Sequence, residues 1–281
     1  KTSPEVPMYQ ALAESLNLPA VATVKQLGID KAFESGERFG LDLTNVDRVL
    51  GVALGGGVET NPLQMAQAYA AFANEGLMPE AHFITRIENA SGEVIATHKN
   101  TQKRVVDKSV ADKMTSMMLG TFTNGTGISS SPNGYVLAGK TGTTEAAFNP
   151  VYTSDQWVIG YTPDVVISHW LGFPTTDENH YLSGSTSNGA AHIFRSMAET
   201  ILPYTPGSTF TVKNAYELNG IAPKNAQNHV TDSGGTQSSD TITDIRGRAQ
   251  NLIDEAERAI SDAKIKEKAK TIWDTIVDLF Q

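Results

Sequence analysis

The middle of the chain contains the stretch that decides how the rest is interpreted, Ala138-Gly139-Lys140-Thr141-Gly142-Thr143-Thr144. In a strand, its lysine and hydroxyl groups would lie beside a backbone that a ligand can approach closely, because Gly142 has no side chain in the way. An extended peptide could pair with such a strand while Lys140 and the hydroxyls hold its terminal carboxylate. An ordinary junction between a turn and a strand carries the same letters, so both interpretations stay open on this stretch alone.

The segments around this stretch alternate between strand and helix patterns. Strand-like runs lie at 83–87, 93–95, 135–138, 156–161 and 165–173. Several of the turns between them are short, and short turns join antiparallel neighbours. Helices are expected from Pro62, after the N-cap residue Asn61, from Asp107, and over 189–202, where a helix would cover the sheet. These patterns predict an α+β fold with an antiparallel sheet flanked by helices.

The composition excludes several classes of protein. The chain has 281 residues, a net charge of -9 and no cysteine, so disulfides and thiolate chemistry are excluded. The excess of negative charge, with no block of lysine and arginine, argues against a nucleic-acid partner. No stretch approaches the roughly 18 consecutive apolar residues of a membrane helix, so we expect this chain to require no membrane contact. The six histidines lack the spacing of a metal site, and we expect no cofactor.

A change of composition near Pro206 suggests three parts. Residues 1–205 would form the folded part. Residues 206–243 are rich in glycine, serine, threonine, asparagine and aspartate, which predicts a flexible linker. In residues 244–281 apolar side chains recur at helical spacing between charges of both signs, which predicts an amphipathic helix. Such a helix could dock on its own protein or stay loose, and a helix that binds a partner or an interface is the alternative.

A Ser-x-Asn sequence occurs twice in the chain. The first copy, Ser15-Leu16-Asn17, would stand on a loop between two short helices. The second copy, at 131–133, lies too close to Lys140 in sequence to form the opposite wall of a cleft, so we interpret it as a turn. A Ser-x-Asn followed later by Lys-Thr-Gly belongs to the active-site set of penicillin-recognising serine enzymes.

With these motifs, the chain resembles the transpeptidase domain of class A penicillin-binding proteins, the bifunctional peptidoglycan synthases, and in particular those of streptococci. The resemblance runs from about Tyr9 to Leu202. It rests on five ordered blocks of residues, 15–21, 53–66, 125–127, 138–144 and 155–163. It implies the antiparallel sheet of penicillin-binding proteins and β-lactamases, incomplete here on its N-terminal side and followed by the linker and the helix.

The resemblance also implies an acyl transfer. In the family, a serine attacks the D-Ala-D-Ala bond of a peptidoglycan stem peptide, an amine of a neighbouring stem completes the crosslink, and β-lactams acylate the same serine. Three residues would take catalytic roles here. Ser15 would relay a proton toward the leaving amine, Asn17 would bind the acyl amide, and Lys140 would supply positive charge near Ser15.

Three further residues would bind the substrate if the resemblance holds. Thr141 and Thr143 would hold the substrate carboxylate, and Gly142 would permit its close approach. The backbone N–H of Thr143 would form half of an oxyanion hole, in which the loss of one donor costs about 3–4 kcal/mol in a serine protease. The partners implied are peptidoglycan stem peptides and β-lactams.

The family's nucleophile motif, Ser-x-x-Lys, does not precede Ser15 in this sequence. The single Ser-x-x-Lys, at 261–264, lies inside the amphipathic pattern, and we interpret it as a solvated helix face. An acyl-enzyme cannot form without its nucleophile. We therefore expect this chain to be inactive alone and to need an upstream segment that carries the nucleophile serine and its lysine. That segment would also lead to an anchor at the outer face of the cytoplasmic membrane.

Three functions stay open at this point. The first is the larger part of a serine D,D-transpeptidase. The second is a hydrolytic relative, a D,D-carboxypeptidase or β-lactamase, which would need a positioned water and base that no motif here supplies. The third is a non-catalytic module that binds cell-wall peptide, and the presence of both the Ser15 and the Lys140 motif argues against it.

Overall fold

The computed structural model describes residues 5–227, all of which belong to one compact unit that spans Lys1–His229. The α-helices are α1 (Met8–Ala13), α2 (Asn17–Leu27), α3 (Ile29–Arg38), α4 (Pro62–Ala73), α5 (Lys108–Thr123), α6 (Ala190–Ile201) and α7 (Ala215–Leu218). The strands are β1 (Leu77–Pro79), β2 (Arg86–Glu88), β3 (Val94–Thr97), β4 (Gln102–Arg104), β5 (Ala138–Ala146), β6 (Asn149–Tyr161) and β7 (Val166–Gly172). Short 3-10 helices are η1 (Leu50–Leu54), η2 (Ile128–Ser130), η3 (Thr186–Asn188), η4 (Leu202–Tyr204) and η5 (Lys224–Gln227). None of the helices within 5–227 combines the length and the apolar composition that a membrane span needs.

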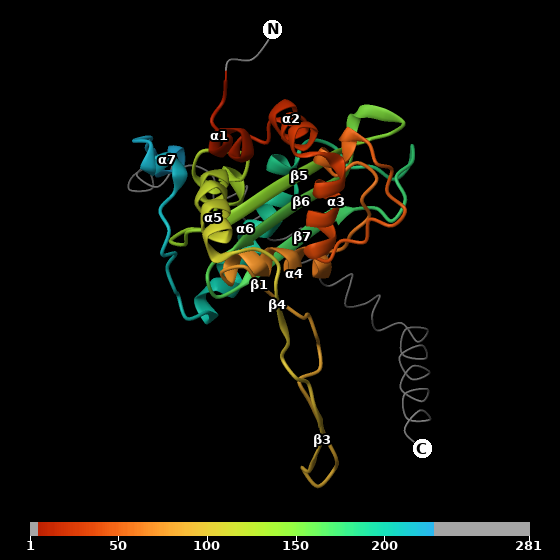
Figure 1. The fold of residues 1–281 in the computed structure, drawn as a ribbon, viewed down its shortest axis with the longest axis vertical. Coiled ribbons are helices and arrows are strands. Elements are labelled where there is room, and N and C mark those ends of the chain that lie inside the picture. Colours follow the sequence, from red (N-terminus) through yellow and green to blue (C-terminus); the bar gives the residue numbers. More distant parts are fainter. Residues whose placement is uncertain (1–4, 228–281) are drawn as a thin grey trace, which may run out of the picture. The chain divides into compact units, whose positions relative to one another are not determined.

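A three-stranded antiparallel sheet in the order β5-β6-β7 forms the centre of this unit (Figure 1). Lys140 on β5 pairs with Ile159, and Gly142 pairs with Trp157. Trp157 in turn lies opposite Trp170 on β7. Because residues that are directly opposite share one face of a sheet, Gly142 and the two tryptophans lie on the same face.

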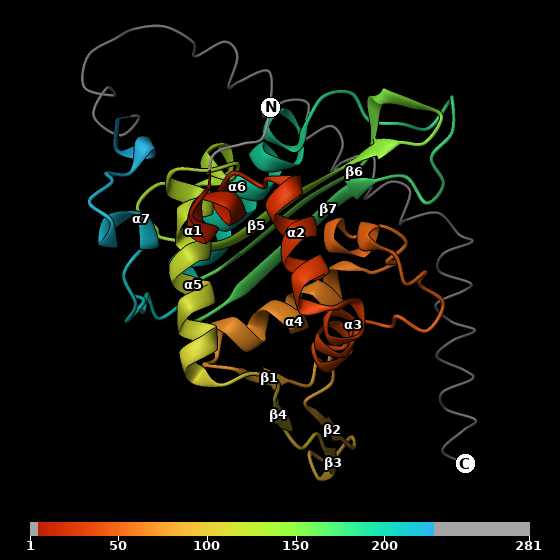
Figure 2. The ribbon, with the colours of Figure 1, turned by 45° about the horizontal axis from the view of Figure 1, so that its top comes forward.

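Helices cover both faces of the sheet, as Figure 2 shows. On one face α6 packs against β6 and β7, and Val158, Ile167 and Phe194 are buried between them. On the other face α4 and α5 pack against the strands, with Met118 and Tyr161 in the core. The α+β fold predicted from the sequence, an antiparallel sheet flanked by helices, is confirmed. Among the described strands β5 lies at the edge of this sheet, so one of its sides makes contacts other than pairing with them.

Local signals placed some of the element boundaries and missed others, such as the start of β6 at Asn149 instead of 156. The side chain of Asn61 accepts a hydrogen bond of 3.0 Å from the N–H of Gln64, so the predicted N-cap of α4 is confirmed. The prediction of a strand at 135–138 was wrong for residues 135–137, because β5 begins only at Ala138. Leu137 is buried in the core beside Phe122, so packing rather than strand pairing fixes the residues before β5.

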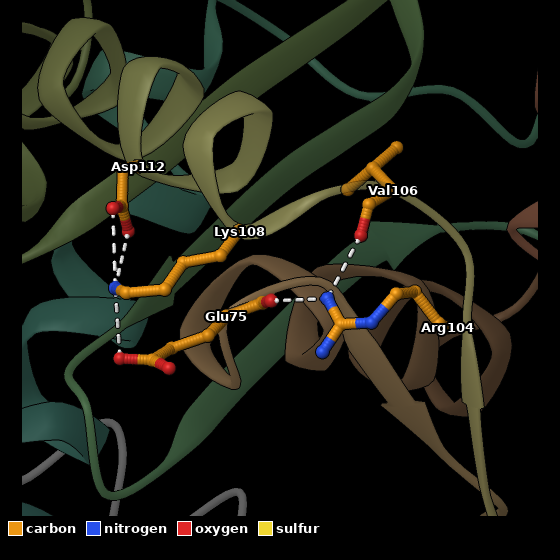
Figure 3. A network of polar contacts seen from close by, with 5 residues as sticks. All are labelled: Glu75, Arg104, Val106, Lys108 and Asp112. Carbon is orange, nitrogen blue, oxygen red and sulfur yellow. Dashed lines mark hydrogen bonds and ion pairs between the residues drawn. The ribbon is translucent and has the colours of Figure 1, made fainter.

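The strand-like runs at 83–87 and 93–95 correspond to the antiparallel pair β2 and β3, which projects away from the sheet and its helices in Figure 1. A second pair, β1 and β4, joins it to the rest of the fold. A polar network at the base of β4 fixes this junction (Figure 3). The guanidinium of Arg104 donates to the carbonyl oxygens of Glu75, at 3.0 Å, and Val106, at 3.2 Å. The ammonium of Lys108 lies 2.8 Å from the Glu75 carboxylate and 3.1 Å from that of Asp112, which ties the end of α4 to the start of α5.

Residues 206–227, which were expected to begin a flexible linker, instead pack against the folded part. Asn214 caps α7 by accepting a hydrogen bond from the N–H of Tyr216, and both side chains are buried. The ring of Tyr216 fills the space above Gly120 of α5 and stacks edge-on against Tyr9 of α1. These packed aromatic contacts hold the segment in spite of its polar composition. Residues 228–281, which include the rest of the expected linker and the expected amphipathic helix, lie outside the described residues.

Candidate active site

A cavity of about 1570 Å³ lies beside β5 and is bordered by η1 and by the loop between α1 and α2. The six residues singled out in the sequence all line it, namely Ser15, Asn17, Lys140, Thr141, Gly142 and Thr143. A second part of its lining is apolar and comes from α1, α2 and α5. Among the described residues that line the cavity, Lys140 is the one lysine or arginine. The cavity therefore combines a single cation with several hydroxyl groups.

Ser15 occupies an unusual backbone position at the end of α1. Its N–H donates to the carbonyl of Leu12 at 3.1 Å, and the N–H of Leu16 donates to the carbonyl of Ala11 at 2.9 Å. These two bonds form a Schellman motif, whose C′ residue adopts the left-handed conformation and is usually glycine. Ser15 fills this position with a φ of 56°. A non-glycine residue there costs about 1 kcal/mol or more, so the loop that presents the Ser15 hydroxyl to the cavity is strained.

Lys140 reaches from β5 across to this loop. Its ammonium donates to the hydroxyl oxygen of Ser15 at 2.7 Å and to the carbonyl oxygen of Thr141 at 2.9 Å. Burial lowers the pKa of Lys140 from 10.5 to about 8, because the charged form loses hydration that these two contacts replace only in part. The structure thus joins Ser15 and Lys140, which are 125 residues apart, in one hydrogen bond. The ammonium of Lys140 in this bond gives up its proton more readily than an ordinary lysine does.

We expect the stability of the folded chain to respond to Lys140 at alkaline pH. Between about 8 and 10.5 the unfolded chain binds a proton at Lys140 that the folded chain has released. The free energy of unfolding therefore rises with pH across this range, by up to about 3 kcal/mol from this group. Denaturant unfolding of the wild-type chain and of Lys140→Met at both ends of the range measures the effect. A difference between the two proteins that stays constant with pH would contradict it.

The residues that follow α5 link the two walls of the cavity. The N–H of Thr126 donates to the carbonyl of Ala13 at 3.0 Å, and the Thr126 hydroxyl lies 2.5 Å from that of Thr141. A Cβ atom on Gly125 would lie 2.1 Å from the carbonyl oxygen of Ala13, so only glycine permits this approach. Thr126 thereby connects the end of α1 to β5. The sequence marked residues 125–127 only as part of the resemblance and assigned them no role.

Asn17 and Thr143 are the remaining predicted site residues that line the cavity. Asn17 is the first residue of α2 and is exposed to the cavity. Thr143 is also exposed there, and its hydroxyl lies 2.6 Å from that of Thr186, which is buried. Nothing in the local sequence pointed to Thr186, because it lies 43 residues after Thr143 in a stretch without a motif. Across the described residues, no group of three histidine, cysteine, aspartate or glutamate side chains could hold a metal ion.

Comparisons with known proteins identify related sequences. The sequence model of the penicillin binding protein transpeptidase domain matches residues 1–199. The chain is 81% identical, over all of its 281 residues, to penicillin-binding protein 2a of Streptococcus pneumoniae, of which it covers 38%. It is also 39% identical over 186 residues to penicillin-binding protein 1F of Bacillus subtilis, a match that covers 65% of this chain and 25% of that protein. The chain thus spans well under half of the length of these relatives.

Solved structures show the same fold. Penicillin-binding protein PonA1 from Mycobacterium tuberculosis matches with a TM-score of 0.66 and 23% identity, over 85% of this chain and 65% of that one. Penicillin-binding protein A from the same organism, solved as an acyl-enzyme complex with ceftriaxone, matches with a TM-score of 0.58 and 23% identity, over 72% of this chain and 50% of that one. The streptococcal resemblance drawn from the motifs is confirmed by the identity to the pneumococcal protein. The chain belongs to the family of penicillin-binding protein transpeptidase domains.

Proposed function

We propose that this chain supplies the substrate-binding wall of a serine D,D-transpeptidase, which crosslinks peptidoglycan stem peptides by acyl transfer from D-Ala-D-Ala. The observation that carries the proposal is the 2.7 Å hydrogen bond between Lys140 and Ser15 inside a cavity lined by Thr141 and Thr143. A peptide that ends in a carboxylate needs a cation and hydroxyl donors at one end of an open groove. The described part of the chain offers them together at this place.

The residues of the cavity divide into two groups in this proposal. Ser15 passes a proton to the leaving amine, and Lys140 keeps the Ser15 oxygen in place and supplies positive charge. A lysine with a pKa near 8 exchanges a proton at neutral pH more readily than an ordinary one, which suits this relay. Asn17, across the cavity, binds the amide of the acyl group.

The second group binds the substrate. Thr141 and Thr143 hold the carboxylate, and the N–H of Thr143 contributes half of an oxyanion hole. Gly142 follows Thr141 on the opposite face of the strand and leaves the backbone there open to the close approach of a ligand. A Cβ atom on Gly142 would lie 3.3 Å from the Cβ atom of Trp157. The strand is therefore closely packed on the face of the sheet that carries Trp157.

The nucleophile of this proposal lies on a segment that this sequence does not contain. The chain matches only 38% of its pneumococcal relative, and the Ser-x-x-Lys at 261–264 lies outside the described residues. The apolar side of the cavity, which includes Leu12, Met114 and Met117, offers the surface on which such a segment can pack close to Ser15 and Lys140. The complete protein then acts at the outer face of the cytoplasmic membrane, held there by an anchor in the same segment.

Labelling with a fluorescent penicillin tests the proposal. The fusion protein for this experiment places the preceding part of pneumococcal penicillin-binding protein 2a in front of this chain, which is 81% identical to the part it replaces. We expect the label on a serine of the preceding part and none on this chain alone. Label on Ser15 or Ser261, or an unlabelled fusion protein, would contradict the assignment. Product analysis then separates transfer, which yields a crosslinked dimer, from hydrolysis, which yields free D-Ala and a tetrapeptide.

A further inference from the structure

Thr186 touches two residues of the proposed carboxylate site without lining the cavity itself. It lies in η3, and its side chain is 2% exposed. Its hydroxyl oxygen lies 2.6 Å from the carbonyl oxygen of Gly142 and 2.6 Å from the hydroxyl oxygen of Thr143. Thr186 therefore stands directly behind the Lys-Thr-Gly-Thr strand, at the point where the carboxylate would bind.

The segment that carries Thr186 is fixed by Gln156 of β6. The side-chain amide of Gln156 donates to the carbonyl of Gly184 at 3.2 Å and accepts from the N–H of Ala190 at 3.0 Å. Gln156 is 1% exposed, so water does not compete for these bonds. Since Thr186 lies between the two anchored residues, its hydroxyl is held at a fixed place relative to the sheet.

The number of hydroxyl hydrogens fixes the direction of these bonds. A hydroxyl has one hydrogen to donate, and a carbonyl oxygen can only accept. Thr186 donates its hydrogen to the carbonyl of Gly142, so in the bond between Thr143 and Thr186 the donor is Thr143. The Thr143 hydroxyl thus directs its hydrogen away from the cavity and presents lone pairs toward it. A carboxylate, which only accepts hydrogen bonds, cannot be held by Thr143 in this state.

We propose that Thr186 is a positioning residue that reverses this chain of hydroxyls when a carboxylate binds. Both hydroxyl hydrogens then rotate, so that Thr186 exchanges its bond to the Gly142 carbonyl for one to Thr143, and Thr143 exchanges its bond to Thr186 for one to the carboxylate. The oxygen atoms of the two threonines are already within hydrogen-bond distance, so the new bond between them needs only a rotation of the hydrogens. The bond that the Gly142 carbonyl loses is offset by the charge-assisted bond that the carboxylate gains. A hydroxyl that accepts one hydrogen bond is a stronger donor in the next, and Thr186 strengthens the hold of Thr143 in this way. The inference rests on the proposed function, because it takes the ligand carboxylate to bind at Thr143.

Acylation of the fusion protein by benzylpenicillin and by its methyl ester tests this inference. The rate for benzylpenicillin divided by the rate for its methyl ester measures how much recognition of the carboxylate speeds acylation. We expect Thr143→Val to lower this ratio, and Thr186→Val, which keeps the shape but loses the hydroxyl, to lower it about five-fold, as for one net hydrogen bond. The double variant should show no lower ratio than Thr143→Val alone, and Thr186→Ser should keep the wild-type ratio. If Thr186→Val does not fold, Thr186→Ala gives the same comparison.

Thr153→Val is the matched control. Thr153 is 6% exposed, and its hydroxyl donates to the carbonyl of Gly184 at 2.7 Å, on the segment that also carries Thr186. Its loss should lower stability without changing the ratio. An equal loss of both rates in Thr186→Val, with the ratio unchanged, overturns the role of Thr186. A ratio that stays unchanged in Thr143→Val as well overturns the carboxylate site of the proposed function itself.

Discussion

In the fusion protein, Lys140→Met is expected to lower the rate of acylation by a β-lactam at least about 100-fold. Lys140 is the one cationic side chain among the described residues of the cavity lining, and it holds the hydroxyl of Ser15 at 2.7 Å. Methionine fills a similar volume but can neither donate to Ser15 nor attract a carboxylate. Losses of this size are typical when a group that acts in proton transfer is removed. The time course of fluorescent penicillin labelling measures the rate.

The control for this experiment is Lys113→Met. Lys113 lies on α5, is exposed, and does not line the active-site cavity, so the same chemical change should leave the rate unaltered. A Lys140→Met protein that keeps more than half of the wild-type rate would show that the cation is dispensable. In that case the contact between Lys140 and Ser15 would be structural.

Ser15→Gly is expected to abolish fast acylation in the fusion protein and to leave the chain more stable than Ser15→Ala, which lacks the same hydroxyl. Ser15 holds the C′ position of a Schellman motif with a φ of 56°, which glycine adopts without strain. We expect the free energy of unfolding to exceed that of Ser15→Ala by about 1 kcal/mol and the acylation rate to fall at least about 100-fold from that of the wild type with the lost hydroxyl. Denaturant unfolding and penicillin labelling give the two quantities.

Ser15→Ala separates the two effects of this substitution. Alanine also lacks the hydroxyl, so the acylation rate should fall as in Ser15→Gly. Alanine keeps a Cβ atom at a positive φ, so it loses the same hydrogen bond from Lys140 but retains the strain. Equal stabilities of the glycine and alanine variants would refute the strain assigned to Ser15.

The sequence predicted those parts of the structure that rest on local chemistry. Asn61 predicted the start of α4 because an asparagine side chain caps the first turn of a helix wherever that helix lies. Ser15 and Lys140 were brought together only through the resemblance, since no local pattern shows that two residues 125 apart touch. The positive φ of Ser15 was not predicted either, because glycine is the residue that normally signals such a position.

Tertiary packing explains what the sequence could not show. Composition favoured a flexible chain after Pro206, yet Tyr216 is buried against Gly120 and Tyr9 because those distant residues leave a space of the right shape. Thr186 likewise became part of the site through the fold alone, since Gln156 anchors the segment around it. Contacts of this kind depend on the relative placement of whole elements, and a single sequence does not encode that placement in any short stretch.

The long separation between the two walls of the cavity has a consequence during protein synthesis. The loop with Ser15 is made first, while Thr126, which ties down the end of α1, follows Ala13 by 113 residues, and Lys140 follows Ser15 by 125. At about 5–20 residues per second, a ribosome needs roughly 6–25 s to add the missing partners. A helix of six residues such as α1 is not stable alone, so its strained end forms only after these partners have been translated, and the pocket matures only then.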